Sequence, residues 1–294
     1  MSNVILQVLA RDLPELPAPM AGIVAQLRNP NLIDLEALID KIKACGNLSD
    51  IVLRMVNTGY LRHGRIADNL DDAVLLVGVE AVRHTVLGAL LYSMFPKRKL
   101  VQNFSRENFL RHCLGTAIAA QMLLDAAGLG EQYDSYRLIT YGLLHDIGIV
   151  ALDRCLPVTL NRIFQMAAEE HMPILEAEVK VLGKLTHSVI GEWVCGKWNL
   201  PPDIRNVVQY HHAPRKAKGS GEEVVLMHIA DVISFNYYES LLESVHKYGM
   251  DVELVRSVGL TMSQISEVEE ALPERVERAM QRLDVEALES FSFC

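Results

Sequence analysis

The histidines and aspartates of this 294-residue chain include a spaced series that can bind metal ions. The members of this series are His112, His145, Asp146, His187, His211, His212 and Asp231. Neutral imidazoles and carboxylates bind Zn, Fe, Mn, Co or Ni without requiring a thiolate. Because these residues are expected on separate helices, the series predicts a pocket for one or two divalent metal ions, whose identity the sequence leaves open.

The dipeptide His145-Asp146 lies inside YGLLHDIG at 141–148 and is the centre of the predicted pocket. Both side chains can face one site if the helix breaks there, and Gly148 is expected to supply that break. One carboxylate can bridge two metals about 3.5–4 Å apart and thereby promote phosphoryl displacement by water. Asp146 is the candidate bridge, and both residues are candidate catalytic groups. The alternative for this pair, a buried ion pair or a capping interaction without metal, stays open.

The adjacent residues His211 and His212 leave a second alternative open. Both can be ligands, or one can face the pocket while the other faces the carbonyls at the helix C-terminus. His228 lies one turn before Asp231, and it is expected to pack beside the pocket rather than to bind metal.

Apolar residues recur at helical spacing along nearly every segment, and no convincing run of alternating apolar and polar residues predicts a strand. The pattern predicts an all-α protein. Asp71 and Asp72 are expected to cap a helix in the apolar stretch before Phe95. Ser105 is expected to cap another helix, which ends at Gly128. Further helices are predicted at about 35–45, 51–56, 134–144, 157–171, 174–184, 187–198, 202–212 and 222–245.

A polar, basic segment at 96–103 separates an N-terminal helical part from the part that holds the histidines. We therefore expect an N-terminal helical subdomain at 1–100, a helical core with the metal pocket at 101–238, and a C-terminal helical appendage at 239–294. In the appendage, Glu274 and Arg278 have the spacing of an exposed helical ion pair. This amphipathic tail can pack on its own chain or across a homodimer.

A formal net charge of −9 disfavours sequence-independent binding to nucleic acid. The basic stretches at 96–99 and 215–218 are short and are expected to be solvated loops. No apolar segment has the length of a membrane span, and the first ten residues lack the features of a signal peptide. Five scattered cysteines without a C-x-x-C pair favour reduced thiols and a cytoplasmic location.

The order of the histidines and aspartates resembles the HD superfamily of metal-dependent phosphohydrolases, and other segments resemble the HDOD domain over about residues 8–235. The segments are LPELP at 13–17, LRMVN at 53–57 with Tyr60, AVLLVGVEAVR at 73–83, YGLLHDIG at 141–148, WNLP at 198–201 and HIAD at 228–231. The resemblance implies an N-terminal helical subdomain packed on an HD-like helical core. It also implies a role in bacterial signalling or regulation, with catalysis usually unproven or lost. For such a role we expect protein partners.

His187 and His211-His212 resemble the longer pattern of the two-metal cyclic-dinucleotide phosphodiesterase branch, but three features depart from it. Ile149 stands where that branch has a lysine, and Asn108 stands where it often has a metal-binding glutamate. The residues APRKAK at 213–218 replace its Gly-Tyr-Pro element. Loss of the cation removes a favourable electrostatic contribution to the transition state, worth several kcal/mol. Metal binding is therefore better supported than hydrolysis.

The leading hypothesis from the sequence is a signalling module with a divalent-metal pocket and weak or absent catalysis. The chain shows no receiver or output domain, so regulatory input is expected from another chain or a small molecule, including an anionic nucleotide or phosphate. The alternative is a metal-dependent phosphohydrolase that acts on a nucleotide or another phosphate ester. A scaffold without metal is the third interpretation.

Overall fold

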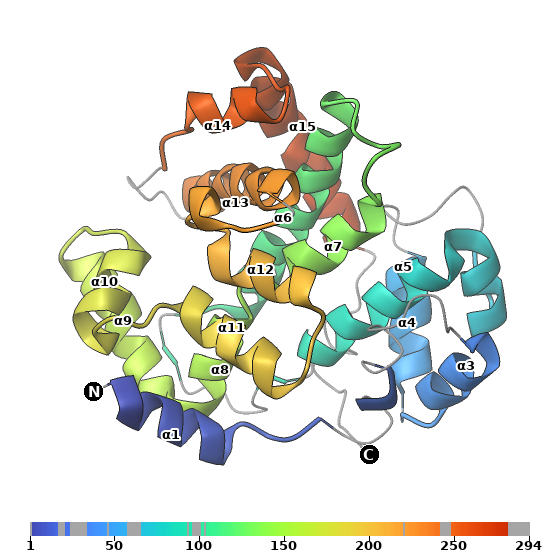
Figure 1. The fold of residues 1–294 in the computed structure, drawn as a ribbon, viewed down its shortest axis with the longest axis horizontal. Coiled ribbons are helices and arrows are strands. Elements are labelled where there is room, and N and C mark those ends of the chain that lie inside the picture. The colour runs from blue at the N-terminus through green and yellow to red at the C-terminus, as the bar shows by residue number, and fades with distance from the viewer. Residues whose placement is uncertain are drawn as a thin grey trace.

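The computed structural model describes residues 2–16, 21–23, 34–45, 47–57, 66–92, 94–95, 101–102, 104–219, 221–241 and 248–281. Every regular element within these ranges is a helix, so the all-α prediction is confirmed (Figure 1). One continuous hydrophobic core runs from Ile5 in the first helix to Met280 in the last. The predicted boundaries at residues 100 and 238 stay predictions, and the basic stretch at 96–99 lies outside the described residues.

The N-terminal part consists of α1 (Ser2–Asp12), α3 (Leu35–Lys43), α4 (Leu48–Val56) and α5 (Leu70–Tyr92). The prediction that Asp71 or Asp72 caps α5 is wrong. Asn69 has this role, because its Oδ1 accepts a hydrogen bond from the backbone N–H of Asp72 at 2.8 Å. Within α5, the helix is interrupted at Gly78, whose φ of 82° lies in the left-handed region.

Asn57 follows α4, and its side chain holds the segment that leads into α5. Its side-chain amide donates to the carbonyl of Ala67 and accepts from the N–H of Ala67, both at 2.9 Å. These two bonds join positions ten residues apart and thus hold α4 beside α5.

The centre of the molecule is α6 (Arg106–Ala126), which packs on α7 (Ser135–Leu144), α13 (Gly221–Leu241) and α15 (Met262–Met280) (Figure 1). As predicted, Ser105 caps α6, since its hydroxyl accepts from the N–H of Asn108 at 3.2 Å. Gly128, with φ of 69°, follows the helix end. Nearly every face of α6 is buried, which explains why its sequence is apolar on all sides.

The remaining helices surround this centre. They are α8 (Ile147–Cys155), α9 (Pro157–Glu169), α10 (Ile174–Leu182), α11 (His187–Lys197), α12 (Pro202–Tyr210), the 3-10 turn η2 (Pro214–Lys216) and α14 (Val252–Ser257). Four of them, α9 to α12, match predicted helices closely, whereas α1, α8 and α14 were not predicted. Pro202 begins α12 without penalty, because the first turn of a helix needs no N–H from proline.

In the C-terminal part, α15 buries one face against α6 and exposes the other. The buried residues are Ile265, Val268, Leu272, Val276, Ala279 and Met280. On the exposed face, Glu274 and Arg278 form the predicted ion pair. The described part of this segment thus packs on its own chain.

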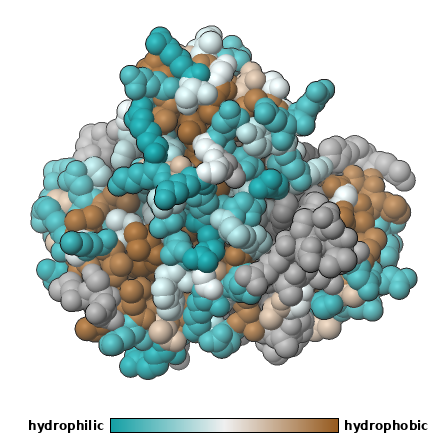
Figure 2. Space-filling model, viewed as in Figure 1, coloured by the Kyte–Doolittle hydropathy of each residue, from teal (hydrophilic) through white to brown (hydrophobic). Residues whose placement is uncertain are grey.

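The surface in Figure 2 is polar across the middle of the face shown, with apolar patches on both flanks. Among the described residues, no helix combines the length and apolar character that crossing a bilayer requires.

Candidate metal centre

The structure brings all seven residues of the predicted series together. They come from six elements: His112 from α6, His145 from the end of α7, Asp146 from the start of α8, His187 from the start of α11, His211 and His212 from the end of α12, and Asp231 from α13. Most of these positions are helix ends. The connections between helices therefore bring the side chains together, and no single helix face presents them all.

The break that aims His145 and Asp146 at one site lies between these two residues. The expectation that Gly148 breaks the helix is wrong, because Gly148 is inside α8. Its lack of a side chain serves packing instead: a Cβ at this position would overlap the carbonyl of His187 in α11. Gly148 therefore lets α8 and α11 approach closely enough for Asp146 and His187 to meet.

Asp146 occupies the N-cap position of α8, where an aspartate usually accepts a hydrogen bond from the first turn. Here its side chain makes no such bond. The carboxylate turns toward the histidines instead, and its two oxygens face different groups of ligand atoms. This arrangement is the one expected of a bridging carboxylate.

The first group contains His112, His145, Asp146 and Asp231. The Nε2 atoms of His112 and His145 lie 3.1 Å apart. Oδ2 of Asp146 lies 3.4 Å from Nε2 of His145, and Oδ1 of Asp231 lies 3.3 Å from Nε2 of His112. Two imidazole nitrogens and two carboxylate oxygens thus converge on one place.

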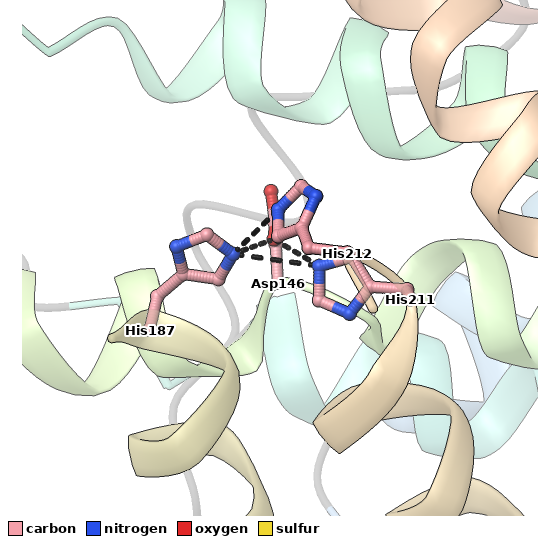
Figure 3. Close-up of side chains that lie close together, drawn as sticks. All are labelled: Asp146, His187, His211 and His212. Atoms are coloured by element: carbon pink, nitrogen blue, oxygen red, sulfur yellow. Dashed lines mark hydrogen bonds and ion pairs between the residues drawn. The ribbon is translucent and has the colours of Figure 1, made fainter. Parts of the chain in front are cut away.

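The second group contains Asp146, His187, His211 and His212 (Figure 3). Oδ1 of Asp146 lies 3.2 Å from Nε2 of His187 and 3.5 Å from Nε2 of His211. Nε2 of His212 lies 3.0 Å from Nε2 of His187, and its Nδ1 lies 3.3 Å from Oδ2 of Asp231. Both members of the double histidine therefore face the cluster, and ligation by both stays a prediction.

Hydrogen bonds on the far side of the rings assign their protons. Nδ1 of His145 donates to the carbonyl of Gly142 at 2.8 Å, and Nδ1 of His211 donates to the carbonyl of Val208 at 2.9 Å. Since a carbonyl can only accept, the ring proton is on Nδ1 in both residues. Each neutral ring therefore presents the lone pair of Nε2 to the cluster.

Glu178 of α10 orients His187 in the same way, and the sequence analysis missed it. Its Oε1 accepts from Nδ1 of His187 at 2.8 Å, and its Oε2 accepts from the backbone N–H of His187 at 3.0 Å. Metal-binding histidines usually have such a partner. The sequence contained an indication of this role, because Glu178 is a charged residue at a core-facing position of its helix, four residues before the buried Leu182.

Two other contacts complete the surroundings of the cluster. The hydroxyl of Ser234 donates to the backbone carbonyl of His112 at 2.8 Å, so its oxygen accepts from Nδ1 of that ring at 3.3 Å. His228 donates from Nδ1 to the backbone carbonyl of His211 at 2.7 Å. His228 therefore supports a ligand position from outside, as predicted.

The carboxylates and imidazoles shift one another's pKa values. Burial lowers the pKa of His145, but the charges of Asp146 and Asp231 outweigh burial and raise it to about 10. Burial and the neighbouring His211 hold the pKa of His212 well below its usual value. Burial raises the pKa of Asp146, but His145 and His187 reverse this and hold it well below its usual value. In the absence of another cation, protons on some rings thus balance the carboxylates.

The donor set fits a metal ion. Oδ1 of Asp146 is buried and has no hydrogen-bond partner, although three imidazoles surround it. The ligand atoms of His112, His145 and Asp146 lie within 4.8 Å of one another, and so do those of Asp146, His187, His211 and His212. A buried oxygen without a donor is explained when a cation satisfies it. Both groups of residues can hold a metal ion.

A cavity of about 190 Å³ opens above the cluster, and His112, Asp146, His187, His212 and Asp231 form its floor. Ile149 and Asn108 line it, at the two positions where the sequence departs from the phosphodiesterase branch. Among the described residues that line this cavity, none is a lysine or an arginine.

Two arginines near the surface form ion pairs away from the cavity. Arg111 pairs with Glu107 and Glu277, and Arg215 of the basic stretch at 215–218 pairs with Asp251 and Glu253. Both guanidinium groups are therefore held by carboxylates.

Known proteins resemble this chain in both sequence and structure. An uncharacterized protein of Treponema pallidum (strain Nichols) is 27% identical over 210 residues, which are 68% of this chain and 38% of the relative. The chain thus spans well under half the length of this curated relative.

Three crystal structures share the fold. An HDOD domain protein of unknown function from Geobacter sulfurreducens superposes with a TM-score of 0.72 at 18% identity, over 94% of this chain and 97% of that chain. A protein from Shewanella amazonensis, provisionally named a phosphohydrolase, gives 0.72 at 21% identity, over 96% and 98%. A protein from Marinobacter aquaeolei, provisionally named a signal transduction protein, gives 0.74 at 18% identity, over 97% of this chain and 65% of that chain.

The sequence pattern of one family covers more than half of the chain. It is the HDOD domain, which matches residues 13–214 and therefore includes six of the seven clustered residues, all but Asp231. The match agrees with the all-helical fold and with the three structural relatives. The chain belongs to the HDOD domain family.

Proposed function

We propose that this chain is a metal-bearing signalling module of the HDOD family, with two divalent metal ions and weak or absent catalysis. The observation that carries the proposal is the position of Asp146. Its Oδ2 faces His112 and His145, and its Oδ1 faces His187 and His211. A carboxylate placed between two sets of imidazoles is suited to bridge two metals.

The pocket above the cluster supports weak rather than efficient phosphoryl transfer. Ile149 lines it where a cation would stabilise a phosphate, and the described lining residues include no lysine or arginine. Metals of this kind supply an activated water and neutralise charge on a phosphate when they are bound. The described residues that line the cavity offer no further positive side chain to assist them, and such assistance is worth several kcal/mol.

The names given to two structural relatives favour different functions. The structure from Marinobacter aquaeolei is named for signal transduction, and the one from Shewanella amazonensis for phosphohydrolysis. In a signalling module, the metal-bound helices would present surfaces to a protein partner. The second candidate is a metal-dependent phosphohydrolase for a nucleotide or another phosphate ester, and the same position of Asp146 supports it, because two bridged metals can activate a water.

Turnover measurements separate the two candidates. Metal-loaded protein is assayed with a cyclic dinucleotide, p-nitrophenyl phosphate and bis(p-nitrophenyl) phosphate, with Asp146→Ala as the control. The signalling proposal predicts rates far below about 1 s⁻¹, the low end of ordinary enzymatic turnover. A rate above this value that is lost in Asp146→Ala would establish the phosphohydrolase instead.

A further inference from the structure

The cavity above the cluster is unusually aromatic. Six of its sixteen lining residues are aromatic, whereas aromatic residues make up 6% of the chain, so the cavity concentrates them. The six are Phe104, Phe109, Phe164, Phe235, Tyr238 and Tyr248.

The aromatic residues form two walls. In the first, the rings of Phe104 and Phe164 are stacked with centroids 5.6 Å apart, and Phe109 meets Phe104 edge-on at 5.6 Å. In the second, Phe235 and Tyr248 have centroids 4.7 Å apart. Apolar ring surface therefore extends along both walls of the cavity.

The second wall reaches the metal cluster and is held firmly against α13. The ring of Phe235 meets that of His112 edge-on, with centroids 6.4 Å apart. The side chain of Asn236 binds the backbone of Tyr248 through two hydrogen bonds, of 2.8 and 2.9 Å. An atom of a bound molecule that contacts the cluster would thus lie next to an aromatic surface that is fixed in position.

These rings differ from the residues of the hydrophobic core. All six are half-buried, whereas the ten largest fully buried side chains are aliphatic apart from Tyr141. Phe104, Phe109 and Phe164 pack against the hydrophobic core and stay partly exposed. Their partly exposed surface is available to a ring of a bound molecule, and aromatic pairs gain about 0.5–1.5 kcal/mol beyond area burial.

The size and charge of the cavity restrict its occupant. A volume of about 190 Å³ slightly exceeds the cavity of about 150 Å³ that holds one benzene, so one ring and a small head group fit inside. Drug-sized ligands need about 300 Å³ or more. Two divalent ions with the carboxylates of Asp146 and Asp231 would leave a net charge of about +2 at the floor, which favours an anionic head group.

We propose that this cavity binds a small aryl phosphate: one aromatic ring between the two walls, with its phosphoryl group on the metals. The inference rests on the proposed metal centre. The ring, and not a lysine or arginine, supplies the selectivity. A cyclic dinucleotide, with two bases, is too large to enter completely.

The test is calorimetric titration of the full chain after its metal content has been measured by elemental analysis. Phenylphosphonate, which is not hydrolysed, is compared with methylphosphonate. We expect phenylphosphonate to bind at least about tenfold more tightly, because burying a ring gains about 1.5–3 kcal/mol. Phe164→Leu should reduce this preference severalfold without weakening methylphosphonate. Val158→Ala, at a position on the same helix that is 83% exposed, should leave it intact.

Equal affinities of the two probes in metal-loaded protein would overturn the aromatic site and leave the metal centre standing. A preference unchanged in both Phe164→Leu and Phe235→Leu would overturn it as well, since the ring would then bind elsewhere. Two variants are used so that the test stands if one of them folds poorly, which thermal melting shows. Protein that takes up no metal on reconstitution and still prefers phenylphosphonate would support the aromatic site and contradict the proposed function. Protein that takes up no metal on reconstitution and binds neither probe would contradict both.

Discussion

Oδ1 of Asp146 lies 3.2 Å from Nε2 of His187, and no hydrogen bond satisfies this buried carboxylate oxygen. The ring proton of His187 is on the opposite nitrogen, where Glu178 accepts it at 2.8 Å. With a neutral ring, two atoms with lone pairs would face each other, so the contact needs a positive charge. This charge is either a second proton on His187, whose pKa is raised against the effect of burial by Glu178 and Asp146, or a metal ion. Buried polar atoms rarely stay unpaired in folded proteins, so this contact favours a cation at the cluster.

Glu178→Gln should weaken metal binding about 10–100-fold, because removing the partner of a ligand histidine has an effect of this size. The amide cannot accept from both the ring and the backbone N–H of His187. Competition with a fluorescent chelator measures the affinity. Glu176→Gln, at an exposed position of the same helix, is the matched control and should bind metal normally. Equal affinities of the two variants would contradict the role of Glu178.

Gly148→Ala should destabilise the protein by about 1–3 kcal/mol, because an added methyl group overpacks the contact between α8 and α11. The new Cβ would overlap the carbonyl of His187. The same displacement should separate His187 from Asp146 and lower the metal content. Denaturant unfolding of metal-free protein and elemental analysis measure the two effects. Gly130→Ala is the control, because nothing lies within 4 Å of its added Cβ.

Metal binding should weaken as the pH falls, because protons compete for the same nitrogens. The pKa values of His112, His145 and His187 are raised in the folded protein, so their protonation stabilises the metal-free protein. This stabilisation is fully present below about pH 6.5, the usual pKa of histidine. This stabilisation is lost as the pH rises through the folded-state values, about 10 for His145.

The increase in Tm on metal addition should therefore grow from pH 6 to pH 8, since release of the protons that the metal displaces becomes more favourable as the pH rises. Differential scanning calorimetry of metal-free and metal-loaded protein measures this increment. An increment that does not change across this range would show that the metal binds away from the imidazoles.

Much of the fold follows from local sequence signals. Ser105 and Gly128 mark both ends of α6, and Pro202 marks the start of α12, because each residue satisfies a requirement of its own backbone position. In contrast, α8 lacks a polar face, since seven of its nine residues are buried, so its sequence carries no helical periodicity. Only two residues lie between the end of α7 and the start of α8, and the pattern did not separate the two helices.

The site was predictable in its residues but not in its geometry. The family resemblance named the seven clustered residues, and the structure brings them together. The roles of Gly148 and Glu178 depend on contacts between helices far apart in sequence, α8 with α11 and α10 with α11. Periodicity within one helix contains no information on such contacts. For the same reason, the sequence left open whether both His211 and His212 face the cluster.

The most direct test of the central claim is elemental analysis of protein prepared without chelator and without oxygen, wild type beside Asp146→Ala. Wild type should contain about two equivalents of a divalent transition metal, because Asp146 lies between two groups of ligands. Asp146→Ala should lose the metal, and its Tm should fall to that of metal-free wild type or below. No metal in wild type, even after reconstitution with Mn, Fe, Co, Ni or Zn, would contradict the account.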